Sequence, residues 1–114
     1  PYLQYAHARA HQIVDRAKAE SIAPAVDYNA EPTLVTRLIH RFPEIIEYAA
    51  AEMEPHIVTT YLIDLAGAFN SWYAQEQILD GTPAAAHKVA VVDAVRNTLK
   101  NGLWVLGIPA PERM

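Results

Sequence analysis

Apolar residues recur every three or four positions along nearly the whole chain, which is the spacing of one face of an α-helix. The clearest run has apolar residues at positions 58, 61, 62, 65, 69 and 72, as in a helix with one buried stripe. No segment shows the strict alternation that predicts a β-strand. The pattern therefore predicts an all-α bundle of about five helices, in which residues 1–114 form one domain.

Prolines and glycines divide this pattern into segments. The first helix is expected to end near residue 23, because the residue before Pro24 disfavours the α conformation. Gly107 is predicted to adopt the left-handed conformation that ends the last helix. The segment after it has two prolines and no periodicity, so we expect it to lie extended across the bundle. The predicted helices cover about residues 2–23, 31–41, 43 onward, 55–79 and 84–106.

The opening of the first predicted helix carries two tyrosines and an arginine on one narrow stripe. At about 100° per residue, Tyr2, Tyr5 and Arg9 fall within an arc of roughly 60°. Aromatic rings beside a permanent cation suit an unpaired nucleotide, which stacks on the rings and pairs with the guanidinium. The same residues would also suit a helix surface that covers a neighbouring helix, so the stripe alone leaves both interpretations open.

The fourth and fifth predicted helices carry further candidates. Phe69 and Trp72 share the buried stripe and are expected in the core, whereas Tyr73 lies about 100° away from Trp72. Spacing leaves open whether Tyr73 is a second stacking wall or a residue at the rim of the core. On the fifth helix, the spacing between Asp93 and Arg96 favours an ion pair within the helix. Gly102 is expected to allow the close approach of another backbone.

Composition limits the possible chemistry. The net charge is −4, from nine Lys and Arg against thirteen Asp and Glu, whereas non-specific nucleic-acid binders carry a basic surplus. An RNA-binding role would therefore depend on a few exposed bases and leave most backbone contacts to another part of a longer protein. The chain begins with Pro1 inside a helical pattern, so we expect it to be a piece of such a protein. It has no cysteine, which excludes disulfides and thiolate chemistry.

Two other functions compete with RNA binding at this stage. His7 and His11 have the i, i+4 spacing at which two imidazoles share a metal, so a free-standing metalloenzyme is one alternative. It is the weaker one, since no third ligand and no catalytic motif accompany the pair. The acidic balance and the alanine-rich helix faces suit a second alternative, which is a helical protein-interaction module without an RNA role.

Several motifs, in this order, resemble the C-terminal anticodon-binding domain of class I arginyl-tRNA synthetases. The resemblance spans essentially the whole chain, and its opening and closing motifs are its most specific parts. The signature Asp-Ala-Leu-Arg of that domain has Val95 at its third position here. The matching segments are Tyr2–Arg9, Phe42–Glu44, Glu54–His56, Phe69–Tyr73, Asp93–Arg96, Lys100–Leu103 and Ala110–Met114.

The resemblance implies a helical bundle that docks the anticodon loop of arginine tRNA. It implies that a parent protein ligates arginine to this tRNA with ATP and Mg, in the cytoplasm, through a catalytic domain of the same chain. The catalytic signatures of the HIGH and KMSKS types are absent here, so the segment is expected to be a monomer that binds RNA without a cofactor, a metal or a membrane. Some relatives carry a further aromatic residue where this chain has Gln77. The residues implied to lie near the anticodon are Tyr2, Tyr5, Arg9, Tyr73 and Met114.

Overall fold

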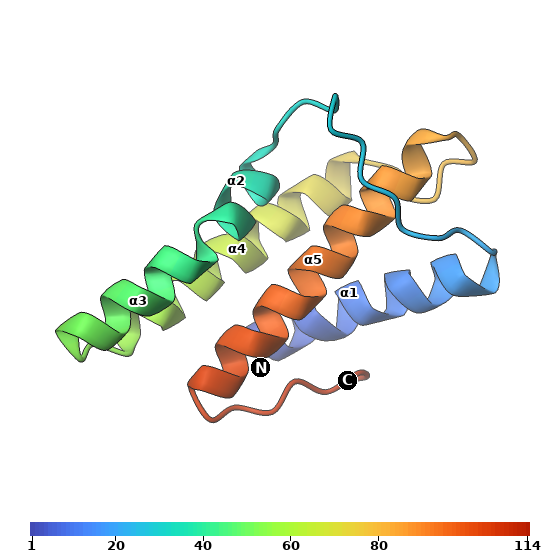
Figure 1. Ribbon diagram of the computed structural model, residues 1–114. Coiled ribbons are helices and arrows are strands. Elements are labelled where there is room, and N and C mark those ends of the chain that lie inside the picture. Colours follow the sequence, from blue (N-terminus) through green and yellow to red (C-terminus); the bar gives the residue numbers. More distant parts are fainter.

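A computed structural model describes all 114 residues and contains five helices and no strand, which confirms the all-α prediction. Helix α5 runs through the middle of the bundle and packs against α1, α2 and α4 (Figure 1). None of the helices has an apolar stretch long enough to cross a membrane. The helices are α1 (Tyr2–Ala19), α2 (Leu34–His40), α3 (Phe42–Glu52), α4 (His56–Gln75) and α5 (Ala84–Val105).

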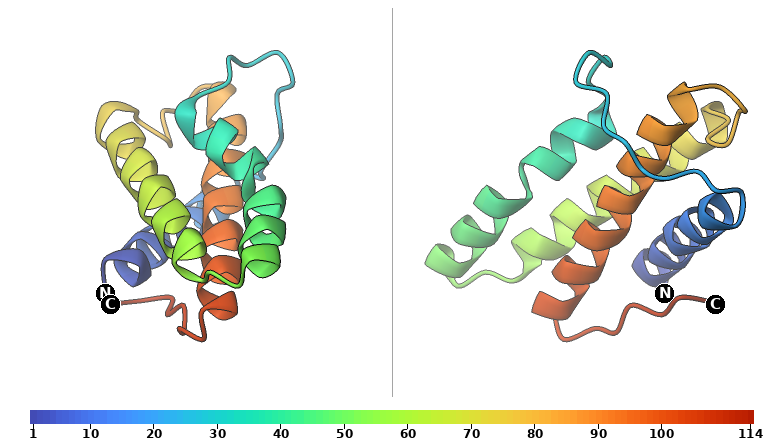
Figure 2. Two further views of the ribbon diagram at one scale, coloured as in Figure 1. Left: turned by 90° about the vertical axis from the view of Figure 1, so that its left-hand side faces the viewer. Right: turned by 45° about the vertical axis from the view of Figure 1, so that its right-hand side comes forward.

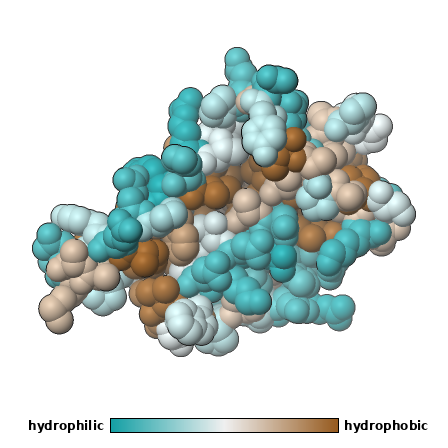
Figure 3. Space-filling view, viewed as in Figure 1, coloured by the Kyte–Doolittle hydropathy of each residue, from teal (hydrophilic) through white to brown (hydrophobic).

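The core lies between α4 and α5 and is closed by α1, α2 and α3. Leu62, Leu65 and Phe69 of α4 have no exposed surface, as the predicted stripe of this helix requires. Trp72 is only partly buried and packs at the edge of the core. On the face seen in Figure 3, polar residues cover most of the surface and hydrophobic residues show in the seams between helices.

Helix α1 ends four residues before the predicted boundary. Ser21 adopts a left-handed conformation with φ of 59°, and the backbone N–H of Ile22 bonds to the carbonyl of Ala17 at 2.8 Å. These are the conformation and the hydrogen bond of a Schellman ending, which brings Ile22 back against the core. The burial of Ile22 therefore ends the helix before the restriction imposed by Pro24 takes effect.

Helices α2 and α4 are also shorter than predicted. Helix α2 begins after Thr33, whose side chain accepts a hydrogen bond from the backbone of Thr36 in a capping box, so the predicted start at residue 31 is wrong. Helix α4 ends before Glu76, whose backbone is extended. The loop that follows is held by Lys88 of α5, whose ammonium lies 3.0 Å from the Asp80 carboxylate. That contact comes from another helix and has no signal in the local pattern.

Two predictions about α5 have different outcomes. Asp93 and Arg96 form the expected ion pair within the helix at 2.7 Å. Gly102 does allow a close approach, but the group that approaches is the Leu62 side chain and not a backbone. A Cβ atom at position 102 would lie 2.6 Å from Leu62 Cδ2.

The C-terminal segment is extended, as predicted, and it turns back onto α1. Gly107 has a φ of 74°, and the N–H groups of Gly107 and Ile108 bond to the carbonyls of Trp104 and Leu103. This complete Schellman ending reverses the chain after α5. Residues 108–114 then run extended beside α1, so that the two termini lie close together (Figure 2). We call this segment the tail.

Candidate nucleic-acid interface

The stripe predicted on α1 forms one wall of a surface pocket. Tyr2 and Tyr5 are about half exposed, at 49% and 57%, and Arg9 is exposed one turn further along the helix. They are free of the core because the buried face of the helix, which includes Ala6 and Ala10, is centred about 100° round α1 from them. The pocket has a volume of about 380 Å³ and is lined by Tyr2, Tyr5, Ala6, Ala8, Arg9, Gln12, Asn70 and Met114.

Arg9 connects α1 to α4. Its Nη1 donates a hydrogen bond to Oδ1 of Asn70 at 3.0 Å, and Nδ2 of Asn70 donates to the Tyr2 hydroxyl at 3.3 Å. The Arg9 guanidinium also lies over the Tyr73 ring, 4.9 Å from its centroid. A cation over an aromatic face is an attractive arrangement. Together these contacts hold the guanidinium at the rim of the pocket.

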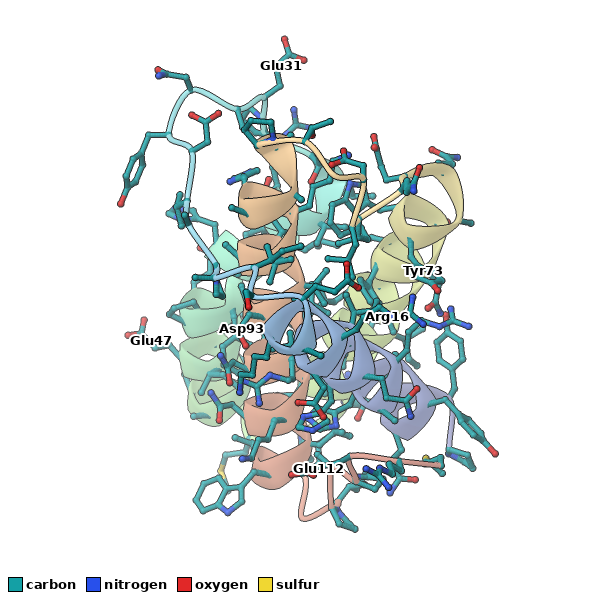
Figure 4. The ribbon with its side chains drawn as sticks, turned by 90° about the vertical axis from the view of Figure 1, so that its right-hand side faces the viewer. Arg16, Glu31, Glu47, Tyr73, Asp93 and Glu112 are labelled. Atoms are coloured by element: carbon teal, nitrogen blue, oxygen red, sulfur yellow. The ribbon has the colours of Figure 1, made fainter.

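Tyr73 lies at the rim of the core, which is one of the two interpretations that spacing left open, and its role as a stacking wall stays a prediction. Its ring packs beside Phe69 of the core, with centroids 6.3 Å apart, while 39% of the residue is exposed. Tyr73 does not line the Tyr2 pocket. It lines a second pocket with Arg16 and Gln77. Figure 4 labels Tyr73 on α4 and Arg16 on α1. Arg9, which covers the Tyr73 ring, therefore separates the two pockets.

The lining of the first pocket suits a flat, neutral or negatively charged ligand. Although the protein is acidic, no carboxylate side chain lines this pocket, and its one charged side chain is the Arg9 guanidinium. Two phenol rings offer faces for stacking, and the amides of Gln12 and Asn70 offer donors and acceptors to the edge of a base. Arg9 is able to donate paired hydrogen bonds to a base or a phosphate.

Sequence reasoning missed Asn70 and Gln12. Asn70 lies in the middle of a long helix, where asparagine is an unfavourable residue, and this is the signal that would have indicated a role for its side chain. Gln12 follows Arg9 by three residues and so continues the stripe of α1. Neither side chain could be assigned to the pocket without knowing that α4 lies beside α1.

His7, one of the two histidines considered above as metal ligands, is buried. It is only 2% exposed, and its Nδ1 lies 2.9 Å from the carbonyl oxygen of Pro111. Burial lowers the pKa of His7 below its ordinary value. His11 stacks beside it, and Nε2 of His11 lies 3.3 Å from Asp15 and 3.4 Å from Glu112. No group of three or more His, Cys, Asp or Glu side chains is arranged to hold a metal.

Comparisons with known proteins show the family of the chain. The family model described as a DALR anticodon binding domain matches residues 3–114. The chain is 44% identical to an arginine–tRNA ligase of Methanocorpusculum labreanum and 37% identical to arginine–tRNA ligase 1 of Bacillus cereus, in both cases over its whole length. It spans 21% and 20% of these relatives, respectively. The match is therefore to about one fifth of each relative.

Solved structures show the same arrangement of helices. The arginyl-tRNA synthetase of Thermus thermophilus superposes with a TM-score of 0.78 at 33% identity, covering all of this chain and 21% of that chain. A putative arginyl-tRNA synthetase from Campylobacter jejuni shares the fold with a TM-score of 0.86 at 21% identity, covering 99% of this chain and 26% of that chain. With the family match over residues 3–114, these findings establish that the chain belongs to the DALR anticodon binding domain family.

Proposed function

We propose that this chain binds the anticodon loop of an arginine tRNA. The observation that carries the proposal is the pocket of about 380 Å³ in which Tyr2, Tyr5, Arg9 and Met114 come together without a carboxylate side chain. Tyr73 joins this group through the Arg9 guanidinium. All five residues that the resemblance implies are thus on one surface of the protein, at the junction of α1, α4 and the tail.

The physics of unpaired bases fits this surface. Anticodon bases are free to leave the stack, and each base that stacks on an aromatic side chain contributes about 1–3 kcal/mol. The thioether of Met114 offers a polarizable contact to a ring. The net charge of −4 argues against a broad contact with phosphates, so we propose that the bases provide most of the affinity.

We further propose that the chain is the C-terminal part of an arginine–tRNA ligase of the cytoplasm. Ligation of arginine with ATP and Mg would then be carried out by the remaining four fifths of such a protein, to which this domain would present the tRNA. This division of roles is supported by the comparisons, in which the chain matches only about 20% of the length of its relatives.

The test uses a fluorescently labelled anticodon stem-loop of arginine tRNA and measures its fluorescence anisotropy. We expect Tyr5→Ala to weaken binding by about five- to 150-fold, the equivalent of one lost stacking contact. Tyr48→Ala is the matched control, because Tyr48 on α3 is also 57% exposed and lies outside the pocket. The control should bind like the unmodified chain.

A second pair of variants tests whether the Arg9 guanidinium contributes to RNA binding. Arg9→Ala should weaken binding, since it removes both the donor at the pocket rim and the cover of the Tyr73 ring. Arg37→Ala, at an exposed position of α2, should have no effect. Equal binding of a stem-loop with a scrambled anticodon, or unchanged binding by both Tyr5→Ala and Arg9→Ala, would overturn the proposal.

A further inference from the structure

Three consecutive residues of α1 are buried, which one packing face cannot explain. Ala6, His7 and Ala8 are all less than 5% exposed, and three neighbours on a helix span about 200° of its circumference. Ala6 belongs to the hydrophobic core, whereas His7 and Ala8 do not. A second element must therefore cover the other side of α1, and the tail is that element.

The tail runs parallel to α1 in a defined register. A helix rises about 1.5 Å per residue and an extended chain about 3.3 Å, so seven residues of helix match three of the tail. Prolines suit this course because they favour extended backbone and have no N–H that needs a partner. The contacts follow this register: Gln4 with Pro109, His7 with Pro111, and His11 with Glu112.

Of these three contacts between α1 and the tail, the one between His7 and Pro111 is the most buried. Because a carbonyl oxygen only accepts, the proton of the imidazole is on Nδ1, and Nδ1 donates to Pro111. Nε2 is then unprotonated, and it is buried without a hydrogen-bond partner. Gln4 and Glu112 lie nearer to solvent than His7, so their contacts contribute less to the docking of the tail.

The docked tail ends at the pocket. Met114, three residues after Pro111, lines the pocket together with Tyr2 and Tyr5. We infer that His7 is a positioning residue for RNA recognition, whose imidazole fixes the tail so that Met114 faces the anticodon. His7 touches no ligand itself. The inference rests on the function proposed above, and it assigns a role to a buried polar side chain that packing alone does not require.

Two substitutions of His7 separate the effect of its hydrogen bond to the tail from the effect of its side-chain volume. Asn in place of His7 keeps a neutral N–H donor near the place of Nδ1, whereas Leu keeps the volume and removes the donor. We expect His7→Leu to weaken binding of the anticodon stem-loop by about five- to tenfold, the scale of one lost contact to a base. His7→Asn should stay within about twofold of the unmodified chain.

A double-mutant cycle tests whether His7 acts through Met114. If it does, His7→Leu should cost less than about twofold once Met114→Ala is already present. Fully additive losses, or normal binding by His7→Leu, would overturn the inference. Where His7→Leu fails to fold, Gln4→Ala takes its place in the cycle, since it removes a tail contact at a partly exposed position.

A measurement without RNA separates this inference from the proposed function. The chain has two methionines, so NMR of labelled methionine methyl groups gives one signal for Met53 and one for Met114. His7→Leu should move the Met114 signal to the position of an unstructured methionine and leave Met53, which caps the C-terminal end of α3, unchanged. If Met114 does not move, the positioning role is wrong even where RNA binds. If Met114 moves but the unmodified chain binds no stem-loop, the function is wrong and the docking of the tail by His7 stands.

Discussion

At the scale of single residues, the imidazole of His7 is buried in an environment that disfavours its protonation. Burial is the largest effect and lowers the pKa of His7, while the hydrogen bond to Pro111 opposes it. The positive charges of His11, Arg96 and Lys100 are smaller effects that lower the pKa further. Asp15 and Glu112 lie on the side of His11 and not against His7. The folded protein therefore holds His7 in its neutral form over a range of pH in which the unfolded chain binds a proton.

The sign of the resulting pH dependence follows from this difference. Below the ordinary pKa of 6.5 the unfolded state takes up a proton at His7 before the folded state does, so the contribution of His7 to stability is lost as the pH falls. We expect the free energy of unfolding to fall less between pH 7.5 and pH 5.5 in His7→Asn than in the unmodified chain. Urea unfolding of both proteins at several pH values measures this. Parallel curves for the two would show that His7 titrates as it does in the unfolded chain.

At the scale of elements, two helix-interior glycines have different surroundings. Glycine in a helix is about 1 kcal/mol less favourable than alanine, so replacing it stabilises the helix wherever a methyl group fits. At Gly67 of α4 a Cβ atom would meet only the Tyr2 hydroxyl, at an ordinary contact distance of 3.8 Å. At Gly102 of α5 it would meet three atoms of Leu62 at 2.6 to 3.1 Å, and Leu62 is fully buried.

We therefore expect these two substitutions to have opposite effects on stability. Gly67→Ala should raise the free energy of unfolding by up to about 1 kcal/mol. Gly102→Ala should lower it, because overpacking a core costs about 1–3 kcal/mol and exceeds the gain in helix propensity. Thermal and urea unfolding give both values, and Leu62→Val in the Gly102→Ala background should recover part of the loss. Stabilisation by Gly102→Ala would mean that Leu62 moves aside without cost and that α4 and α5 are not held together tightly at this point.

At the scale of the whole molecule, the charge distribution predicts how RNA binding depends on salt. Nine cationic residues against thirteen acidic ones leave few positions for phosphate contacts, and Arg9 is the one cationic side chain that lines the pocket of Tyr2 and Tyr5. Each phosphate neutralised on a single strand contributes a slope of about −0.7 to a plot of log affinity against log salt. One or two contacts then give a total slope of about −0.7 to −1.4.

Anisotropy titrations of the stem-loop between about 50 and 200 mM KCl measure this slope. Arg9→Ala should make the slope shallower by up to about 0.7, the value of one phosphate contact. Tyr5→Ala should lower the affinity and leave the slope unchanged, because a stacking contact releases no counterion. A slope steeper than about −3 would show that phosphates dominate the affinity. The assignment of recognition to exposed bases would then be wrong.

Much of the fold was predictable from local patterns. The period of apolar residues indicates the helices, and the stripe of α4 places Leu65 and Phe69 in the core, where the structure has them. The end of α5 was also predictable, since Gly107 adopts the left-handed conformation. The ends of α1 and α4 were not, because Ile22 packs against the core and Asp80 is held by Lys88 of the next helix, contacts that the period of apolar residues does not indicate.

The stripe of Tyr2, Tyr5 and Arg9 follows from the sequence alone, because the geometry of a helix fixes which side chains share a face. Only the tertiary structure places Asn70 and Tyr73 against that stripe, since the packing of α4 beside α1 depends on residues more than sixty positions apart. The burial of His7 is likewise a tertiary result. A helix pattern shows one face toward the core, and it carries no information about a tail that returns to cover the other side.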